Sequence, residues 1–112
     1  MSIVRLLFWR AKTMIQVRDT FQAKYGHGDE LVRLFKEMEG DFREAMAGAQ
    51  MRLLTDLSGP FFTIVTEMEV ADLATWQNLI EKSFSDPKFG EWFGRMTPLV
   101  ESGRREFYTV VK

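Results

Sequence analysis

The sequence predicts an α+β domain in which helices cover one face of a four-stranded antiparallel sheet. Residues 51–57 and 61–70 are rich in β-branched, leucine and aromatic residues, and they flank Ser58-Gly59-Pro60, where we expect the chain to reverse as a hairpin. We place this hairpin at the centre of the sheet. Residues 14–23 alternate apolar and polar side chains, as a half-buried strand does. Apolar residues at steps of three and four then predict amphipathic helices before and after the hairpin.

Composition limits the class of protein. The 112 residues suffice for one core, and 46% hydrophobic with 28% charged residues is an ordinary globular mixture. The net charge of −1 gives no general attraction for nucleic acid or anionic lipid, and no apolar run approaches the length of a membrane span. The sequence contains no cysteine, which favours a reducing compartment, and we expect the cytoplasm.

We expect two parts in the chain. Residues 1–12 form an apolar and basic arm, in which a strand and a helix fit the pattern equally well. This arm should pack on the domain or on a partner subunit, because its apolar side chains are unfavourable in water. Residues 13–112 should form a single domain.

The segment 14–23 fits a strand, although a helix competes. Asp19 falls on its apolar side, so we expect a bulge or bend there. Asp29 should cap a helix that ends near Gly48. Further predicted signals are a cap at Asp72, inward-facing Leu73, Trp76, Leu79 and Ile80, a helix start at Pro87, a helix end or bend at Pro98, and a last strand over 104–111 after Gly103.

The resulting order, strand, helix, strand, strand, helix, strand, is the ferredoxin-like βαββαβ arrangement. Period-two alternation places Val65 and Glu67 on the sheet face that the helices leave open, together with Arg18. Such a face is too apolar to stand fully in water and too polar for a dry core. We therefore predict a homodimer packed sheet to sheet.

Three stretches resemble the NIPSNAP-like branch of the dimeric α/β-barrel superfamily. They are VRDTFQAKYG at 17–26, DELV at 29–32 and LTDLSGP at 54–60. The resemblance covers about residue 14 to the carboxyl end. It implies a dimeric α/β barrel with a cavity between sheet and helices. Because the superfamily includes cofactor-independent monooxygenases and isomerases, it also implies that Trp76 and Tyr108 can line that cavity.

The residues that could carry chemistry are few. His27, the only histidine, lies between two glycines and is best interpreted as a solvated loop residue, so we expect no metal site and no cofactor. Glu67 is a candidate general base, with Arg18 holding the resulting anion. An ion pair of the two at a dimer seam is the simpler interpretation.

No motif specific for catalysis appears, so two functions stay open. The first is binding of a small apolar or aromatic molecule by Arg18, Glu67, Trp76 and Tyr108, with cofactor-independent monooxygenase or isomerase activity. The alternative is a non-catalytic binding or structural module whose sheet face is filled by the dimer partner. An enclosed pocket lined by Arg18, Glu67 and aromatic residues would favour the first.

Overall fold

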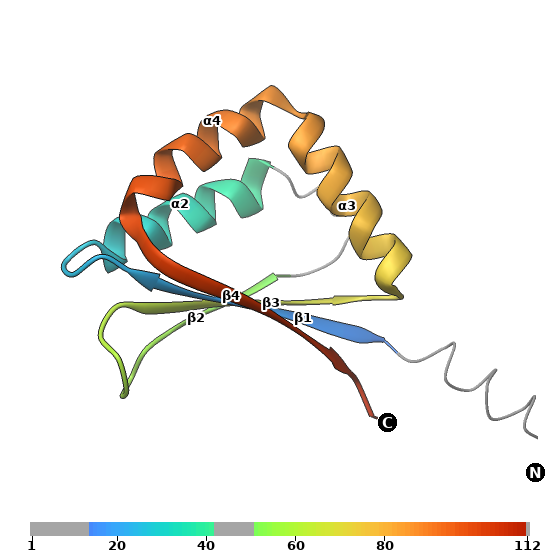
Figure 1. Cartoon of the computed structure of the whole chain (residues 1–112), viewed down its shortest axis with the longest axis horizontal. Coiled ribbons are helices and arrows are strands. Elements are labelled where there is room, and N and C mark those ends of the chain that lie inside the picture. Colours follow the sequence, from blue (N-terminus) through green and yellow to red (C-terminus); the bar gives the residue numbers. More distant parts are fainter. Residues whose placement is uncertain (1–13, 42–50, 112) are drawn as a thin grey trace, which may run out of the picture.

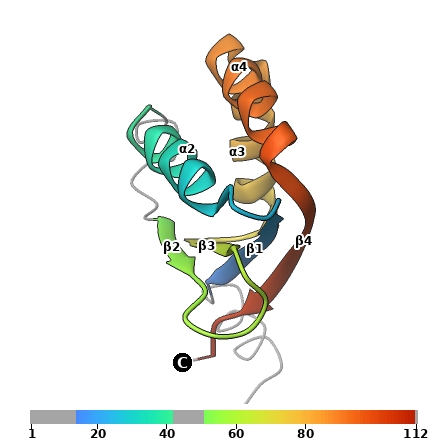
Figure 2. The ribbon, with the colours of Figure 1, turned by 90° about the vertical axis from the view of Figure 1, so that its left-hand side faces the viewer.

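Four antiparallel strands form one sheet in the order β2-β3-β1-β4, and helices lie on one of its faces (Figure 1). The computed structural model describes residues 14–41 and 51–111. The predicted arm, residues 1–12, lies outside them. Viewed along the sheet, the molecule has two layers, with α2, α3 and α4 all above the strands (Figure 2). The predicted ferredoxin-like order is confirmed.

The strands agree with the prediction in number and order but differ at their ends. They are β1 (Ile15–Ala23), β2 (Met51–Thr55), β3 (Thr63–Val70) and β4 (Val100–Thr109). The last strand begins four residues earlier than predicted, and Gly103 lies within it, opposite Phe21. The placement of the hairpin was wrong in one respect: β3 is central, but β2 is an edge strand.

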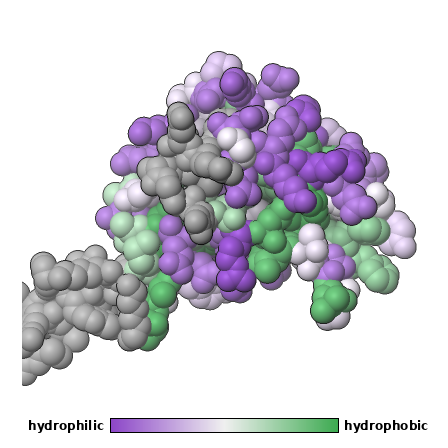
Figure 3. Space-filling view, turned by 180° about the vertical axis from the view of Figure 1, so that it is seen from behind, coloured by the Kyte–Doolittle hydropathy of each residue, from purple (hydrophilic) through white to green (hydrophobic). Residues whose placement is uncertain are grey.

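The turn between β2 and β3 follows from its residues. Gly59 has a φ of +93°, a conformation that glycine adopts without steric cost. Asp56 Oδ1 accepts the backbone N–H of Thr63 at 2.9 Å, which closes the loop at its base. Hydrophobic side chains gather at this end of the molecule (Figure 3), where Leu57 and Phe61 are exposed.

The last two helices start where the sequence predicts, but α2 begins at Gly28, so Asp29, predicted as its cap, lies in its first turn. They are α2 (Gly28–Asp41), α3 (Leu73–Ser85) and α4 (Pro87–Met96), followed by the 3-10 turn η1 (Thr97–Leu99). Asp72 caps α3 by accepting the backbone N–H of Thr75, and Pro87 opens α4. The predicted end of the first helix near Gly48 lies outside the described residues. Leu73, predicted to face inward, is exposed because it stands at the very start of α3.

The core lies between the sheet and helices α2 and α4. Its fully buried side chains include Leu31 from α2 and Ile64 from β3. Trp92 of α4 is 5% exposed, and its indole Nε1 donates to the carbonyl oxygen of Leu34 at 2.6 Å. In contrast, α3 contains no buried residue. Two helices are thus fixed on the sheet, and the third covers it more loosely.

Candidate functional site

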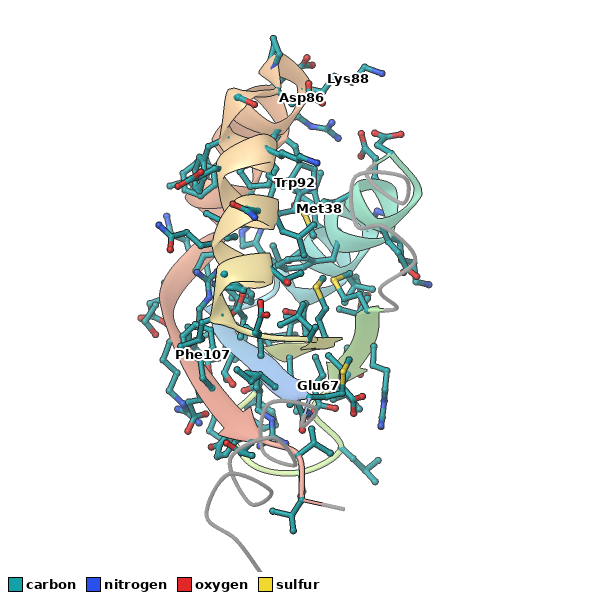
Figure 4. All side chains as sticks on the ribbon, turned by 90° about the vertical axis from the view of Figure 1, so that its right-hand side faces the viewer. Met38, Glu67, Asp86, Lys88, Trp92 and Phe107 are labelled. Atoms are coloured by element: carbon teal, nitrogen blue, oxygen red, sulfur yellow. The ribbon has the colours of Figure 1, made fainter. Side chains whose placement is uncertain are left out.

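A cavity of about 200 Å³ lies between the sheet and the helices. Its wall is mostly apolar, and it is built from aromatic rings and methionines. The aromatic residues are Phe21, Phe35, Trp76, Phe84, Phe89, Trp92 and Phe93, and the methionines are Met38, Met51, Met68 and Met96. Met38 and Trp92 are seen on the helix side of the sheet in Figure 4. Methionine side chains adapt their shape easily, so this wall suits an apolar ligand of variable outline.

Three polar side chains form a row across the floor of the cavity. Asp19 of β1 lies directly opposite Thr66 of β3 and directly opposite Arg105 of β4. Directly opposite residues on adjacent strands have side chains on the same face, about 5 Å apart. All three residues line the cavity, and they present a hydroxyl, a carboxylate and a guanidinium beneath the aromatic ceiling.

Asp19 and Arg105 are joined by two hydrogen bonds. Arg105 Nε donates to Asp19 Oδ1 at 2.7 Å, and Arg105 Nη2 donates to Asp19 Oδ2 at 3.0 Å. The Asp19 side chain is only 14% exposed, so its charge needs this partner. The Arg105 guanidinium also lies over the Trp76 ring, 4.7 Å from the ring centre. The ion pair and the tryptophan together form one edge of the cavity.

The bulge or bend predicted at Asp19 is wrong. The pairing of β1 with both neighbours is continuous through Asp19, and the irregularity falls between Gln22 and Ala23. The reason is that Asp19 is accommodated on the helix face by Arg105 and needs no backbone distortion. Its position on the apolar side of the strand therefore indicates that its side chain faces the cavity.

A shallow groove lies outside the same edge. It is lined by Leu73, Gln77 and Glu81 of α3 and also by Trp76, Ile80 and Arg105. The last three residues line the cavity as well. They separate the cavity from solvent between α3 and β4. Since α3 has no buried residue, this is the wall that can open most easily.

Three of the four predicted binding residues lie on the opposite face of the sheet. Arg18 pairs with Glu67, with Nη2 and Oε2 2.8 Å apart, and Glu67 lies below the sheet in Figure 4. The Arg18 guanidinium lies 5.3 Å from the ring centre of Tyr108. Tyr108 Oη donates to Glu106 Oε2 at 2.7 Å, and this bond raises the pKa of Tyr108 and lowers the pKa of Glu106.

Trp76 alone of the predicted four lines the cavity. The expectation of one pocket lined by Arg18, Glu67 and aromatic residues is therefore corrected, because strand alternation separates Arg18 and Glu67 from the helices. The cavity residues that sequence reasoning missed are Asp19, Thr66 and Arg105. Of these, only Asp19 is recognisable in the sequence, because it falls on the apolar side of its strand.

His27 is exposed in the β1–α2 loop, as predicted. Its Nδ1 lies 3.2 Å from Glu30 Oε2. Among residues 14–41 and 51–111, no three histidine or acidic side chains are grouped closely enough to hold a metal ion. The helices within these ranges include none with the length and apolar character needed to cross a bilayer.

The scan against protein-family models gives no match, and no curated protein matches the sequence. Solved structures match over most of the chain. A NIPSNAP family protein from Agrobacterium tumefaciens is 18% identical, with a TM-score of 0.76 over 85% of this chain and 90% of that one. A NIPSNAP-like domain protein from Burkholderia xenovorans is 13% identical, with a TM-score of 0.80 over 89% and 87%.

A third match is a proposed antibiotic biosynthesis monooxygenase from Chloroflexus aurantiacus. It is 17% identical, with a TM-score of 0.66 over 88% of this chain and 94% of that one. At such identities the matches establish the fold alone. The chain has the ferredoxin-like fold of the NIPSNAP proteins, as the sequence resemblance implied.

Proposed function

We propose that the cavity binds a small, mainly apolar or aromatic molecule that carries one polar group. The observation behind this proposal is the row Thr66, Asp19, Arg105 on the floor of an otherwise apolar cavity. A pocket with apolar walls and a few converging polar groups is the usual form of a small-molecule site. The apolar walls would hold the body of the ligand, and the polar row would fix its orientation.

The size of the cavity sets the size of the ligand. An apolar cavity of about 150 Å³ in another protein admits benzene. The cavity of about 200 Å³ here therefore suits a single substituted ring. A larger ligand would require α3 to move outward.

The polar row also suggests what chemistry is possible. Each Asp19 oxygen accepts one hydrogen bond from Arg105 and keeps a further lone pair for a ligand hydroxyl. Monooxygenase and isomerase reactions without a cofactor would both need a base for a phenol or an enol. In our proposal that base is Asp19 rather than Glu67, because Asp19 is the carboxylate that lines the cavity.

The test uses two probes of nearly equal shape, p-cresol and p-xylene, in which a hydroxyl replaces a methyl group. Two-dimensional NMR titration should show both probes shifting the signals of Trp76 and Trp92. We expect p-cresol to bind about tenfold more tightly, since its hydroxyl reaches Asp19. In Asp19→Asn this preference should shrink.

Steric blocking supplies the matched control. Leu79→Trp adds volume inside the cavity and should abolish binding of both probes. Leu73→Trp makes the same change on the same helix, but at an exposed position outside the cavity, and should bind them as the wild type does. Equal binding to both variants would refute the cavity as the site.

We also propose that the chain forms a homodimer through the open face of the sheet, where Arg18, Glu67 and Tyr108 would contact a second copy. Support comes from Leu54 and Val65, apolar residues on a face that the described helices α2, α3 and α4 leave uncovered. The runner-up function, a non-catalytic binding or structural module, needs only this interface. Light scattering should give twice the mass of one chain at micromolar concentration, and a monomer would refute the dimer.

The absence of cysteine supports the cytoplasm as the proposed compartment.

A further inference from the structure

Three methionines from three different elements come together at the β2 side of the cavity. Met51 of β2 lies directly opposite Met68 of β3. Met68 and Met38 of α2 both pack against Met51, which is 8% exposed. All three residues line the cavity, and Figure 4 shows sulfur atoms between the sheet and the helices. Together they form the methionine cluster.

The backbone brings the sulfur atoms of the cluster toward one point. Directly opposite residues on adjacent strands have side chains on the same face, with Cβ atoms about 5 Å apart. The thioether sulfur lies two bonds beyond Cβ, so the sulfurs of Met51 and Met68 can meet above the space between β2 and β3. Met38 reaches the same space from the helix layer. Donors from two strands and one helix therefore surround it.

Thioether sulfur has a chemistry that no hydrocarbon side chain supplies. It is a soft, uncharged electron-pair donor, and soft sulfur ligands select Cu(I), whereas carboxylates and carbonyls suit Mg²⁺, Ca²⁺ and Mn²⁺. Three sulfur donors match the trigonal coordination that Cu(I) accepts. The expectation of no metal site rested on the absence of cysteine and on a single histidine, so it did not consider thioether ligands.

The surroundings of the cluster suit a single positive charge. Phe89 of α4 also packs against Met51, and aromatic rings attract cations over their faces. Among the described residues that line the cavity, the charged ones are Asp19 and Arg105, and they neutralise each other. The wall therefore has no excess positive charge to repel a monovalent cation. A divalent cation would need anionic ligands, which the cluster lacks.

Methionine is also a common filler of irregular cores, and that role explains isolated methionines. The two strand positions indicate more, because strands favour β-branched and aromatic residues and yet methionine occupies both members of one opposite pair, Met51 and Met68. We propose that the methionine cluster binds the soft monovalent cation Cu(I) through its three sulfur atoms. The proposal does not depend on the proposed function, since the polar row that would orient the ring begins at Thr66 and ends at Arg105 on the β4 side.

Silver(I) is the first probe, because it has the charge and softness of Cu(I) and keeps its oxidation state in air. The chain contains no cysteine, so no thiol competes for the ion. Calorimetric titration in chloride-free buffer should show one Ag(I) bound per chain at micromolar concentration. Cu(I) held by a competing chelator under anaerobic conditions should bind with the same stoichiometry. Absence of binding by both ions would overturn the proposal.

Competition with Zn(II) tests the kind of ligand. Zn(II) prefers histidine, thiolate and carboxylate ligands, so an excess of it should leave Ag(I) on the protein. Displacement of Ag(I) by Zn(II) would place the ion at His27 or at acidic side chains and would overturn the thioether site.

Conservative variants locate the site. Met51→Leu and Met68→Leu each remove one sulfur at nearly constant volume, a change that cores tolerate well. Each should weaken Ag(I) binding at least about tenfold, the loss that even an outer partner of a metal ligand commonly causes. Met96→Leu is the matched control, because Met96 is buried and lines the same cavity but packs in the core with Trp92. It should bind Ag(I) as the wild type does. Equal weakening in all three variants, or in none, would overturn the proposal.

A second measurement uses the wild-type protein alone. In NMR spectra of isotope-labelled methionine methyl groups, Ag(I) should shift the signals of Met38, Met51 and Met68 most. The signal of Met14, which precedes β1, should move least. A largest shift at Met14 or Met96 would overturn the proposal. Titration with p-cresol in separate samples tests the proposed function, and its failure would leave the Ag(I) result standing.

Discussion

At the scale of single residues, strand alternation decides on which face of the sheet a polar side chain lies, so residues adjacent in the sequence can have different partners. Arg104 and Arg105 are adjacent, yet Arg105 reaches Asp19 on the helix face and Arg104 lies on the open face with Glu106. The same alternation separates Arg18 from Asp19. Strands β1 and β4 thus carry one group of charged side chains on the helix face and another on the open face.

The first prediction compares these neighbouring arginines. Arg105→Met removes both hydrogen bonds to Asp19 and leaves its nearly buried carboxylate without a cation, so we expect a loss of about 1 to 3 kcal/mol in the free energy of unfolding. Arg104→Met, at a site 70% exposed, should change it by less than about 0.5 kcal/mol. Urea denaturation at pH 7 measures both. Equal losses would show that the Asp19 pair does not contribute to stability.

The second prediction concerns Trp92. Trp92→Phe removes the hydrogen bond to the Leu34 carbonyl oxygen and part of the contact between α4 and α2. We expect a loss of about 1 to 3 kcal/mol. Trp76→Phe, at a half-buried position on α3, should cost less in the same urea experiment. A larger loss from Trp76→Phe would contradict the view that α4 is the better fixed helix.

At the scale of elements, the two caps differ little but the helices differ greatly. Asp72 caps α3 and Asp86 caps α4 in similar ways. Nevertheless α4 has Trp92 and Met96 buried, whereas α3 has no buried residue. The stability of α3 therefore depends more on its own cap than that of α4 does.

The third prediction follows from the Asp72 cap. The hydroxyl and the backbone N–H of Thr75 both donate to its carboxylate, which lowers the pKa of Asp72. A lowered pKa means that the ionised form stabilises the fold. This contribution is present above about pH 4 and is lost as the pH falls through the lowered pKa.

We expect Asp72→Ala to lower the melting temperature by a few degrees at pH 7 and by less at pH 2. Thr75→Val, which removes the hydroxyl donor but keeps the backbone N–H, should show a smaller effect at pH 7. Thermal unfolding followed by circular dichroism measures these differences. An effect of Asp72→Ala that is the same at both pH values would exclude the charge as its cause.

At the scale of the whole molecule, one sheet serves two surfaces. Its helix face forms the floor of a cavity, and its open face contains the ion pair of Arg18 and Glu67. Since α3 closes the cavity without a buried residue of its own, a ligand in the cavity would link α3 to the sheet. Binding and local stability should therefore be coupled.

The fourth prediction tests this coupling by hydrogen exchange. Without ligand, amides of α3 should exchange faster than those of β1 and β3. Saturating p-cresol should slow exchange in α3 about tenfold or more and change the central strands little. Leu79→Trp, which fills the cavity, should show slow α3 exchange without the probe. Unchanged exchange in α3 with bound p-cresol would mean that this helix is not the covering wall.

The fold was predictable because it depends on local signals. The turn at Gly59, the cap at Asp72, the proline at the start of α4 and the alternation in β1 each act over a few residues, and together they leave one order of elements. The strand ends were harder to predict. β4 begins at Val100 because pairing with β1 extends past Gly103, and that pairing joins segments far apart in the chain.

The sequence by itself determined the order of elements, the ferredoxin-like arrangement, and which residues of β1 and β3 face away from the helices, because these follow from the fixed periods of strand and helix. Only the tertiary structure decided that Asp19 belongs to the cavity floor, since its partner Arg105 lies 86 residues further along the chain. It also decided that Arg52, Glu67, Arg18 and Glu106 form one row. Register between strands is set by long-range pairing, and no local period in the sequence encodes it.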